Sequence, residues 1–261
     1  MKNTSLQPFL KFIVTPQTFT IETNEDGFNR GNVEAICATG KSSKKGSVTE
    51  EYTGEKGFGF KSVFSIADEV RVQSGLWSFR FEHRQGDNGL GMVTPLDAPA
   101  EDLPPDITTR ITLRLTPKAT REYARLLEAI ADMPDTTLFF LRKLATIRVQ
   151  ITHLDARKET ITIQKLLYSS GSTVHIHRSR MVNGEAQTDA SLYFRVRHAI
   201  NDLPDDDRRK GQKVAWVDLA FPVDPETKQP KLSKMGQHVF AYLPLQRLPQ
   251  LQVRSYNLQL G

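Results

Sequence analysis

Hydrophobic and polar residues alternate with a period of two in many segments of this chain, a pattern typical of β-strands with one buried face. Phe19 and Ile21 alternate with polar residues after a turn at Thr15-Pro16-Gln17, and an apolar segment, "FLKFIV", precedes that turn. The segment Thr108–Leu115, "TTRITLRL", alternates in the same way, and "EVRVQSG" and "WSFRFEH" are predicted to pair as a hairpin. The front of the chain therefore predicts several amphipathic strands.

Helical spacing occurs in fewer places. Val33, Ile36 and Cys37 recur at helical intervals, and Phe60–Val70 is predicted as a short helix. The segment "PKATREYARLLEAIADM" begins with a proline, which is favoured at the first helical position, and it carries apolar residues on one face. The segment "DTTLFFLRKL" is predicted as a further helix.

Beyond Ala145 the pattern changes to strands. The strand-like segments are "IRVQITHL", "TITIQKLL", "STVHIHRS", "SLYFRVRH", "KVAWVDLAFPV" and "HVFAYLPL". We therefore predict a mixed first domain over 1–117, a helical connector over 118–146 and a strand-rich second region over 147–261, whose completeness the pattern leaves open.

Composition narrows the class of protein. The chain has 261 residues, of which 38% are hydrophobic and 25% charged, as in soluble globular proteins, and no apolar run approaches membrane-spanning length. The single cysteine, Cys37, excludes an internal disulfide and fits a reducing compartment, so we expect an intracellular protein of the cytoplasm or nucleus without a membrane partner. The net charge of +5 comes from basic residues interleaved with acids, as in Pro204–Lys213, so nucleic-acid binding is not the favoured interpretation.

Three glycines lie close together in Tyr52–Phe64, "YTGEKGFGFKSVF". A Walker A loop would need Lys61 directly after Gly59, but Phe60 intervenes. A looser match, "AICATGKS", follows a helical segment instead of a buried strand, and the order of the glycines is the reverse of the Rossmann fingerprint. A turn used only for packing remains the alternative to a phosphate site.

The pattern G-x-x-G-x-G, after a polar lid and before "FKSVFSIADEV", resembles the second glycine box of the GHKL ATPases, which include heat-shock chaperones, gyrases, histidine kinases and mismatch-repair proteins. The order "NEDGF…ICATGKSSKKG…TGEKGFGFKSVFSIADEVRV" is most similar to the branch that contains sacsin and the plant NO VEIN protein. The resemblance implies a two-layer α/β sandwich of the GHKL type, shortened at its N-terminus, followed by a strand-rich α+β region. It also implies that residues 1–117 bind ATP or ADP with Mg²⁺.

The resemblance assigns roles to individual residues. The glycines and a lid around Lys44 would hold the phosphates, because glycine lets the backbone N–H groups approach them. The turn after Ile21 would hold the adenine through Thr23 or, with a one-residue gap, Asn24, where most relatives have an aspartate. The implied nucleotide-binding residues are Thr23, Asn24, Gly27, Phe28, Lys44, Gly54, Gly57, Phe58, Gly59, Phe60 and Thr109.

The catalytic part of the pattern is missing. Hydrolysing GHKL members carry E-x-x-x-N on a helix before the first strand, whereas this sequence has no Asp or Glu before Glu22, and Asn3 is its only upstream asparagine. No catalytic residue is assigned, and enzymatic activity stays open. The alternative function is a degenerate, non-catalytic interaction or scaffold module, with protein partners or missing domains of a larger protein.

The histidine pair, the cysteine and the tryptophans of the chain do not predict a functional site. His175 and His177 share one strand face, but the sequence offers no third ligand, so no metal site is predicted. Cys37, Trp77 and Trp216 are predicted to be core residues.

Overall fold

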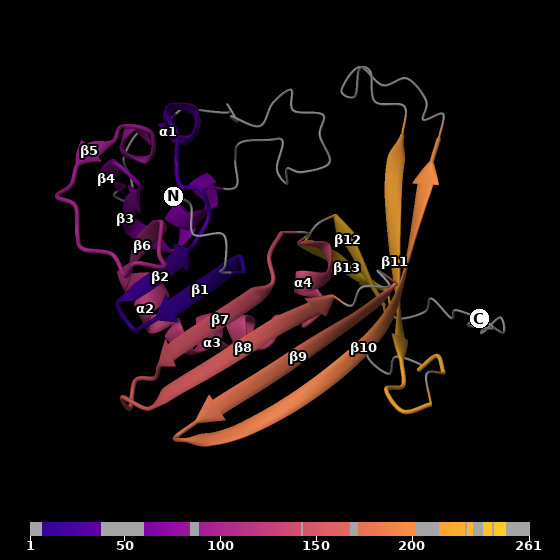
Figure 1. Cartoon of the computed structure of the whole chain (residues 1–261). Coiled ribbons are helices and arrows are strands. Elements are labelled where there is room, and N and C mark those ends of the chain that lie inside the picture. The colour runs from indigo at the N-terminus through magenta and orange to yellow at the C-terminus, as the bar shows by residue number, and fades with distance from the viewer. Residues whose placement is uncertain are drawn as a thin grey trace.

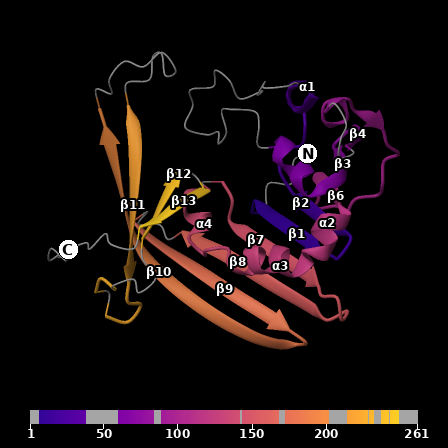
Figure 2. The same cartoon turned by 180° about the vertical axis from the view of Figure 1, so that it is seen from behind.

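The computed structural model of this protein is dominated by one long, twisted sheet carrying a few short helices (Figures 1 and 2). Both views place the short strands of the front half at one end of the molecule and the long strands of the back half at the other. The structure describes residues 7–37, 60–83, 89–141, 143–167, 172–201, 214–227, 229–231, 237–241 and 243–248.

The strands have the following bounds: β1 (Phe9–Val14), β2 (Thr18–Thr23), β3 (Ala67–Ser74), β4 (Trp77–Glu82), β5 (Leu96–Asp97), β6 (Thr109–Leu115), β7 (Thr146–Thr152), β8 (Lys158–Leu167), β9 (Thr173–Val182), β10 (Glu185–Ile200), β11 (Ala215–Val223), β12 (Gln237–Ala241) and β13 (Leu243–Leu248). The helices are α1 (Arg30–Cys37), α2 (Pro117–Arg121), α3 (Tyr123–Ala131) and α4 (Thr137–Phe140), with the 3₁₀ helices η1 (Phe60–Ser65) and η2 (Leu90–Met92).

Within the described residues, eleven strands form one sheet in the order β11-β10-β9-β8-β7-β1-β2-β6-β3-β4-β5, and β12 pairs with β13 separately. Most neighbours are antiparallel, including the predicted β3–β4 hairpin. The exception is β1, which pairs in parallel with β7, from Phe9 opposite Thr146 to Val14 opposite Ile151. This one pairing joins the front and back halves of the chain into a continuous sheet.

The predicted fold class, a two-layer α/β sandwich of the GHKL type followed by an α+β region, is wrong. In the part of the chain that the structure describes, the architecture is a large mixed sheet of eleven strands with few and short helices. Two physical reasons account for the difference. The parallel β1–β7 pair merges what were expected to be separate regions, and several predicted helices are shorter than their apolar pattern suggested.

Three segments show how these helices shorten. Phe60–Val70 is helical only over η1, and strand β3 already begins at Ala67. The proline-initiated helix divides at Glu122 into α2 and α3, and the Thr116 side chain caps α2 by accepting a hydrogen bond from the Ala119 N–H. The last segment retains only the four residues of α4.

Two apolar clusters hold the helices on the sheet. The first packs α2, α3 and α4 against β1, β7, β8 and β9, with Tyr123, Leu138, Ile147, Val149 and Ile163 among its buried residues. The second packs α1 and η1 against β3, β4 and β6. Phe19 of β2 contacts both clusters, so the two clusters lie on the same face of the sheet and meet near its middle.

A buried lysine connects α4 to the sheet. Lys165 of β8 is 7% exposed, and its ammonium donates hydrogen bonds to the carbonyls of Leu138 (3.0 Å) and Leu141 (2.8 Å). Burial, with a smaller contribution from Arg195, lowers the pKa of Lys165 to about 8. The charged form is therefore less favourable in the folded than in the unfolded chain.

We expect the free energy of unfolding to rise with pH because of Lys165. The unfolded side chain titrates near its ordinary pKa of about 10.4, so between about pH 8 and pH 10.4 the unfolded state binds more protons and stability increases, by up to about 3 kcal/mol. Urea unfolding of wild type and Lys165→Met at several pH values in this window measures the difference. The matched control is Lys158→Met on the exposed start of the same strand; a wild-type-minus-Lys165→Met difference that is flat with pH would contradict the assignment.

Candidate functional site

Three hydroxyl side chains lie side by side across neighbouring strands at one end of the front sheet. Thr23 of β2 is the cross-strand partner of Thr109 of β6, and Thr109 is the partner of Ser74 of β3. Partners in register point to the same face, here the covered one that also carries Ile21, Ile111 and Val72. We call Thr23, Thr109 and Ser74 the hydroxyl row.

Ser74 is the hydrogen-bonding centre of the row. It is fully buried, its Oγ accepts a 2.8 Å hydrogen bond from the Phe28 N–H, and it lies 2.6 Å from Thr109 Oγ1. Thr109 is 2% exposed. Ser74 therefore ties the turn after β2 to the strand that carries the predicted threonine. Sequence reasoning missed this residue; the signal was a polar position at the end of the β3 alternation, directly before the turn glycine.

Gly27 allows the turn to lie this close to the row. Its φ of +83° is in the left-handed region, where a side chain is strained. A Cβ at this position would lie 3.1 Å from Thr108 Cγ2 and 3.4 Å from Ser74 Oγ. The backbone conformation therefore favours glycine here, and a side chain would also crowd Thr108 and Ser74.

The structure separates the two candidates for the base-binding position, Thr23 and Asn24. The Asn24 side chain is used within the fold, because its Oδ1 accepts from the Phe9 N–H (2.9 Å) and its Nδ2 donates to the Gln7 carbonyl (3.0 Å). Thr23 Oγ1, in contrast, is buried without a hydrogen-bond partner among the described residues. Thr23 is therefore the residue with unused hydrogen-bonding capacity.

Phe28 and Phe60, both predicted to bind nucleotide, pack in the same apolar cluster. The Phe60 ring lies edge-on to Phe81 with centroids 5.8 Å apart. The ammonium of the next residue, Lys61, donates to the main-chain carbonyls of Ile36 and Met92, and burial lowers its pKa. Lys61 therefore connects the end of α1 to η2, and its ammonium is hydrogen-bonded within the fold.

The remaining predicted residues, Lys44, Gly54, Gly57, Phe58 and Gly59, lie outside the described residues. Gly27, Phe28 and Thr109 lie close to Ser74, and Thr23 is the cross-strand partner of Thr109. Phe60 shares the apolar cluster of Phe28. Asn24 follows Thr23 directly, but its side chain is hydrogen-bonded to the main chain at Phe9, the start of β1.

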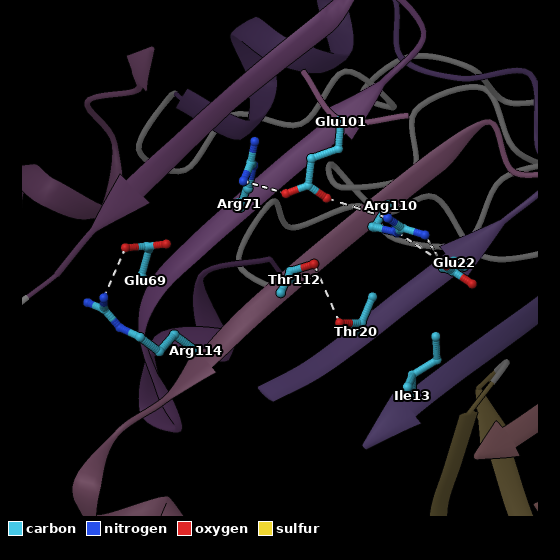
Figure 3. A pocket seen from close by; sticks show the side chains of 9 residues that line it. All are labelled: Ile13, Thr20, Glu22, Glu69, Arg71, Glu101, Arg110, Thr112 and Arg114. Carbon is cyan, nitrogen blue, oxygen red and sulfur yellow. Dashed lines mark hydrogen bonds and ion pairs between the residues drawn. The ribbon is translucent and has the colours of Figure 1, made fainter. Parts of the chain in front are cut away.

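The opposite face of the same strands is charged and forms a shallow hollow of about 320 Å³ (Figure 3). Arg71 pairs with Glu101 at 2.6 Å, and Arg110 links Glu101 to the buried Glu22, which Lys11 also contacts at 3.0 Å. Burial alone would raise the pKa of the Glu22 carboxyl, but its hydrogen bonds from Lys11 and Arg110 outweigh burial and hold that pKa below its ordinary value.

This hollow is a weak candidate for a ligand site. Its carboxylates and guanidinium groups already neutralise one another, and Arg114 likewise pairs with Asp68 at 2.7 Å. A charged ligand would have to displace such a pair before binding, which costs the energy of the existing contact. We therefore place the candidate site at the hydroxyl row and assign the charged face a structural role.

Among the described residues, no group of three or more His, Cys, Asp or Glu side chains could hold a metal ion. The prediction that Trp216 is a core residue is wrong: its side chain is 45% exposed, and the Arg197 guanidinium lies 4.4 Å from the ring centroid. No helix in the described ranges is long and apolar enough to cross a membrane.

Comparison with known proteins gives one partial relative. No family model matches the chain. A stretch of 98 residues, 38% of this chain, is 37% identical to Protein NO VEIN of Arabidopsis thaliana, and the match covers only 3% of that protein's length. Among solved structures, the crystal structure of the N-terminal domain of a DNA repair protein aligns with 67% of this chain and 61% of its own, at 11% identity and a TM-score of 0.37, which supports no conclusion about fold. The chain is thus a partial homologue of NO VEIN.

Proposed function

We propose that this chain binds ATP or ADP, with the base against the hydroxyl row. The observation that carries the proposal is Thr23 Oγ1, a buried hydroxyl without a partner among the described residues, beside the buried Ser74–Thr109 pair. Leaving a buried polar group without a hydrogen bond destabilises the folded chain by about 1–3 kcal/mol, so a ligand that forms this hydrogen bond removes the penalty and binds more tightly. A purine base offers such groups along its edge.

The motifs quoted above support the phosphate end of the proposal. G-x-x-G-x-G at Gly54–Gly59 precedes η1 and resembles a phosphate-binding box, and Lys44 lies in the lid-like polar segment before it. Mg²⁺ would accompany the phosphates as a counter-charge. The proposal concerns nucleotide binding and leaves hydrolysis open.

A second candidate function, a non-catalytic interaction module, is supported by a different part of the molecule. Among the described strands, β11 lies at one edge of the sheet, and it exposes Trp216, Val217 and Leu219 by 45, 37 and 47%. Edge strands with exposed apolar side chains can pair with another chain. This function does not require a bound nucleotide.

Isothermal titration calorimetry of the chain with ATP, ADP and AMP, with and without Mg²⁺, tests the proposal. We expect ATP and ADP to bind with Kd values below about 1 mM, which corresponds to at least about 4 kcal/mol of binding free energy. If folded protein binds neither nucleotide at this concentration, nucleotide binding is wrong and the interaction module is favoured.

We expect Gly57→Val to reduce the affinity for ATP by at least about 30-fold, because a side chain within the glycine box blocks the approach of the backbone to the phosphates. The matched control is Gly211→Val, a glycine of another polar segment that has no assigned role in binding. Equal affinity of the Gly57 variant and the control, measured by the same titration, would refute the phosphate assignment. Circular dichroism verifies that both variants fold.

A further inference from the structure

The groups that line the hydroxyl row are of one chemical kind. Each of its three members ends in a hydroxyl, and the cross-strand neighbours that flank the row are Leu10 beside Thr23 and Trp77 beside Ser74. The row and these flanking neighbours therefore contain no charged side chain. A hydroxyl has one proton and two lone pairs and rotates to suit its partner, whereas an ionised carboxylate only accepts hydrogen bonds.

The Ser74–Thr109 pair can be arranged in two ways. Ser74 Oγ already accepts from the Phe28 N–H, and the 2.6 Å contact with Thr109 allows either oxygen to be the donor. When Ser74 donates to Thr109, the Thr109 proton is free for an acceptor on a ligand. When Thr109 donates to Ser74, Thr109 offers a ligand only its lone pair. The pair can thus present either polarity without a change of backbone.

Thr23 has the same freedom. Its buried Oγ1 has no partner among the described residues, so its proton direction is not fixed by the fold. Two adjacent hydroxyls, Thr23 and Thr109, can therefore both turn toward a hydrogen-bond donor or both toward an acceptor.

The purine bases differ in this property at position 6. Adenine carries an amino group there, which donates, and hypoxanthine and guanine carry a carbonyl oxygen, which accepts. From the hydroxyl row we infer that the site accepts purine nucleotides of both kinds, with a 6-amino or a 6-oxo group. This inference rests on the proposed nucleotide binding and extends it to a ligand class.

The direct test compares ATP with ITP by calorimetry on the unmodified chain in Mg²⁺, because these nucleotides differ only at position 6 and in the adjacent ring proton. We expect Kd values that differ by less than about 5-fold, since either base meets a matching hydroxyl. A preference for ATP above about 30-fold would overturn the inference while leaving nucleotide binding intact. If neither nucleotide binds, the proposed function and the inference fail together.

A single substitution in the hydroxyl row is expected to make the site prefer a 6-amino purine over a 6-oxo purine. Thr23→Asp places an acceptor-only group at the unpaired position, so it should repel a 6-oxo group and raise the ratio of the ITP Kd to the ATP Kd by at least about 10-fold. The matched control is Thr20→Asp on the opposite face of the same strand, which should leave the ratio unchanged. An unchanged ratio in folded Thr23→Asp would overturn the placement of the base at Thr23; the wild-type comparison holds even if this variant fails to fold.

Discussion

Replacing Phe81 by alanine is expected to lower the free energy of unfolding by about 4 kcal/mol, within the range of 3–5 kcal/mol for buried aromatic side chains. Phe81 is fully buried in β4, and its ring packs edge-on against those of Phe60, Phe64 and Phe79 at centroid separations of 5.5–6.3 Å. Its removal leaves a cavity between the sheet and η1. These aromatic pairs add to the burial of apolar area.

Urea unfolding followed by circular dichroism measures this loss. The matched control is Leu76→Ala in the turn of the same hairpin, because Leu76 is fully exposed and should change stability by less than about 0.5 kcal/mol. Equal effects of the two substitutions would mean that η1 does not pack on β4. Because Phe60 directly follows the glycine box, we also expect Phe81→Ala to weaken ATP binding more than Leu76→Ala does.

Tyr123→Ala is expected to cost a similar amount, about 3–5 kcal/mol. Tyr123 begins α3 and is 1% exposed, and its hydroxyl donates to the carbonyls of Val14 (3.2 Å) and Thr152 (2.7 Å). These carbonyls lie at the ends of β1 and β7, the two strands whose parallel pairing joins the halves of the sheet. Tyr123 therefore supports the junction through both its ring and its hydroxyl.

A second substitution separates these two contributions. Tyr123→Phe keeps the ring and removes the hydroxyl, so we expect a loss of about 1–2 kcal/mol, the usual effect of removing one buried hydrogen-bonding group. Arg125→Ala, at an exposed position of the same helix, should have almost no effect and serves as the control. A Tyr123→Phe loss as large as that of Tyr123→Ala would contradict the packing role. Thermal or urea unfolding measures all three variants.

The proposed nucleotide binding and the inferred base tolerance rest on different residues, so the base tolerance can fail while nucleotide binding holds. The phosphate end rests on Gly54, Gly57 and Gly59 as a sequence motif. The base end rests on Thr23, Thr109 and Ser74, whose mutual positions come from strand register. Gly57→Val therefore tests the first, and the ratio of ITP to ATP affinity tests the second.

Local sequence patterns predicted most individual strands correctly. Alternation at Phe19 and Ile21 and in "TTRITLRL" corresponds to β2 and β6, and the proline that follows Thr116 does begin a helix. These features depend on neighbouring residues, whose side-chain period and capping chemistry are written in the sequence itself. The helix predicted over Phe60–Val70 was wrong beyond Ser65, because its apolar residues fit a short 3₁₀ turn followed by a buried strand equally well.

Part of the candidate site was likewise predictable from sequence. The turn at Gly27 and the threonines Thr23 and Thr109 were identified by their position in motifs, and the structure gathers them at one end of the sheet. The choice of Thr23 over Asn24 was not predictable, because it depends on which side chain already has partners in the folded chain. Ser74 was missed for the same reason, since an isolated serine carries no motif.

The sequence by itself therefore determined where most strands and the glycine-containing turns form, because each of these depends on the chemistry of residues a few positions apart. Only the tertiary structure decided that β1 pairs in parallel with β7, from Phe9 opposite Thr146 to Val14 opposite Ile151, and that Ser74 bridges Phe28 and Thr109. Pairing between distant strands is selected by the packing of whole faces against one another, which no local pattern specifies. For this protein, that packing replaces the expected sandwich with one continuous sheet and aligns three hydroxyls in a row.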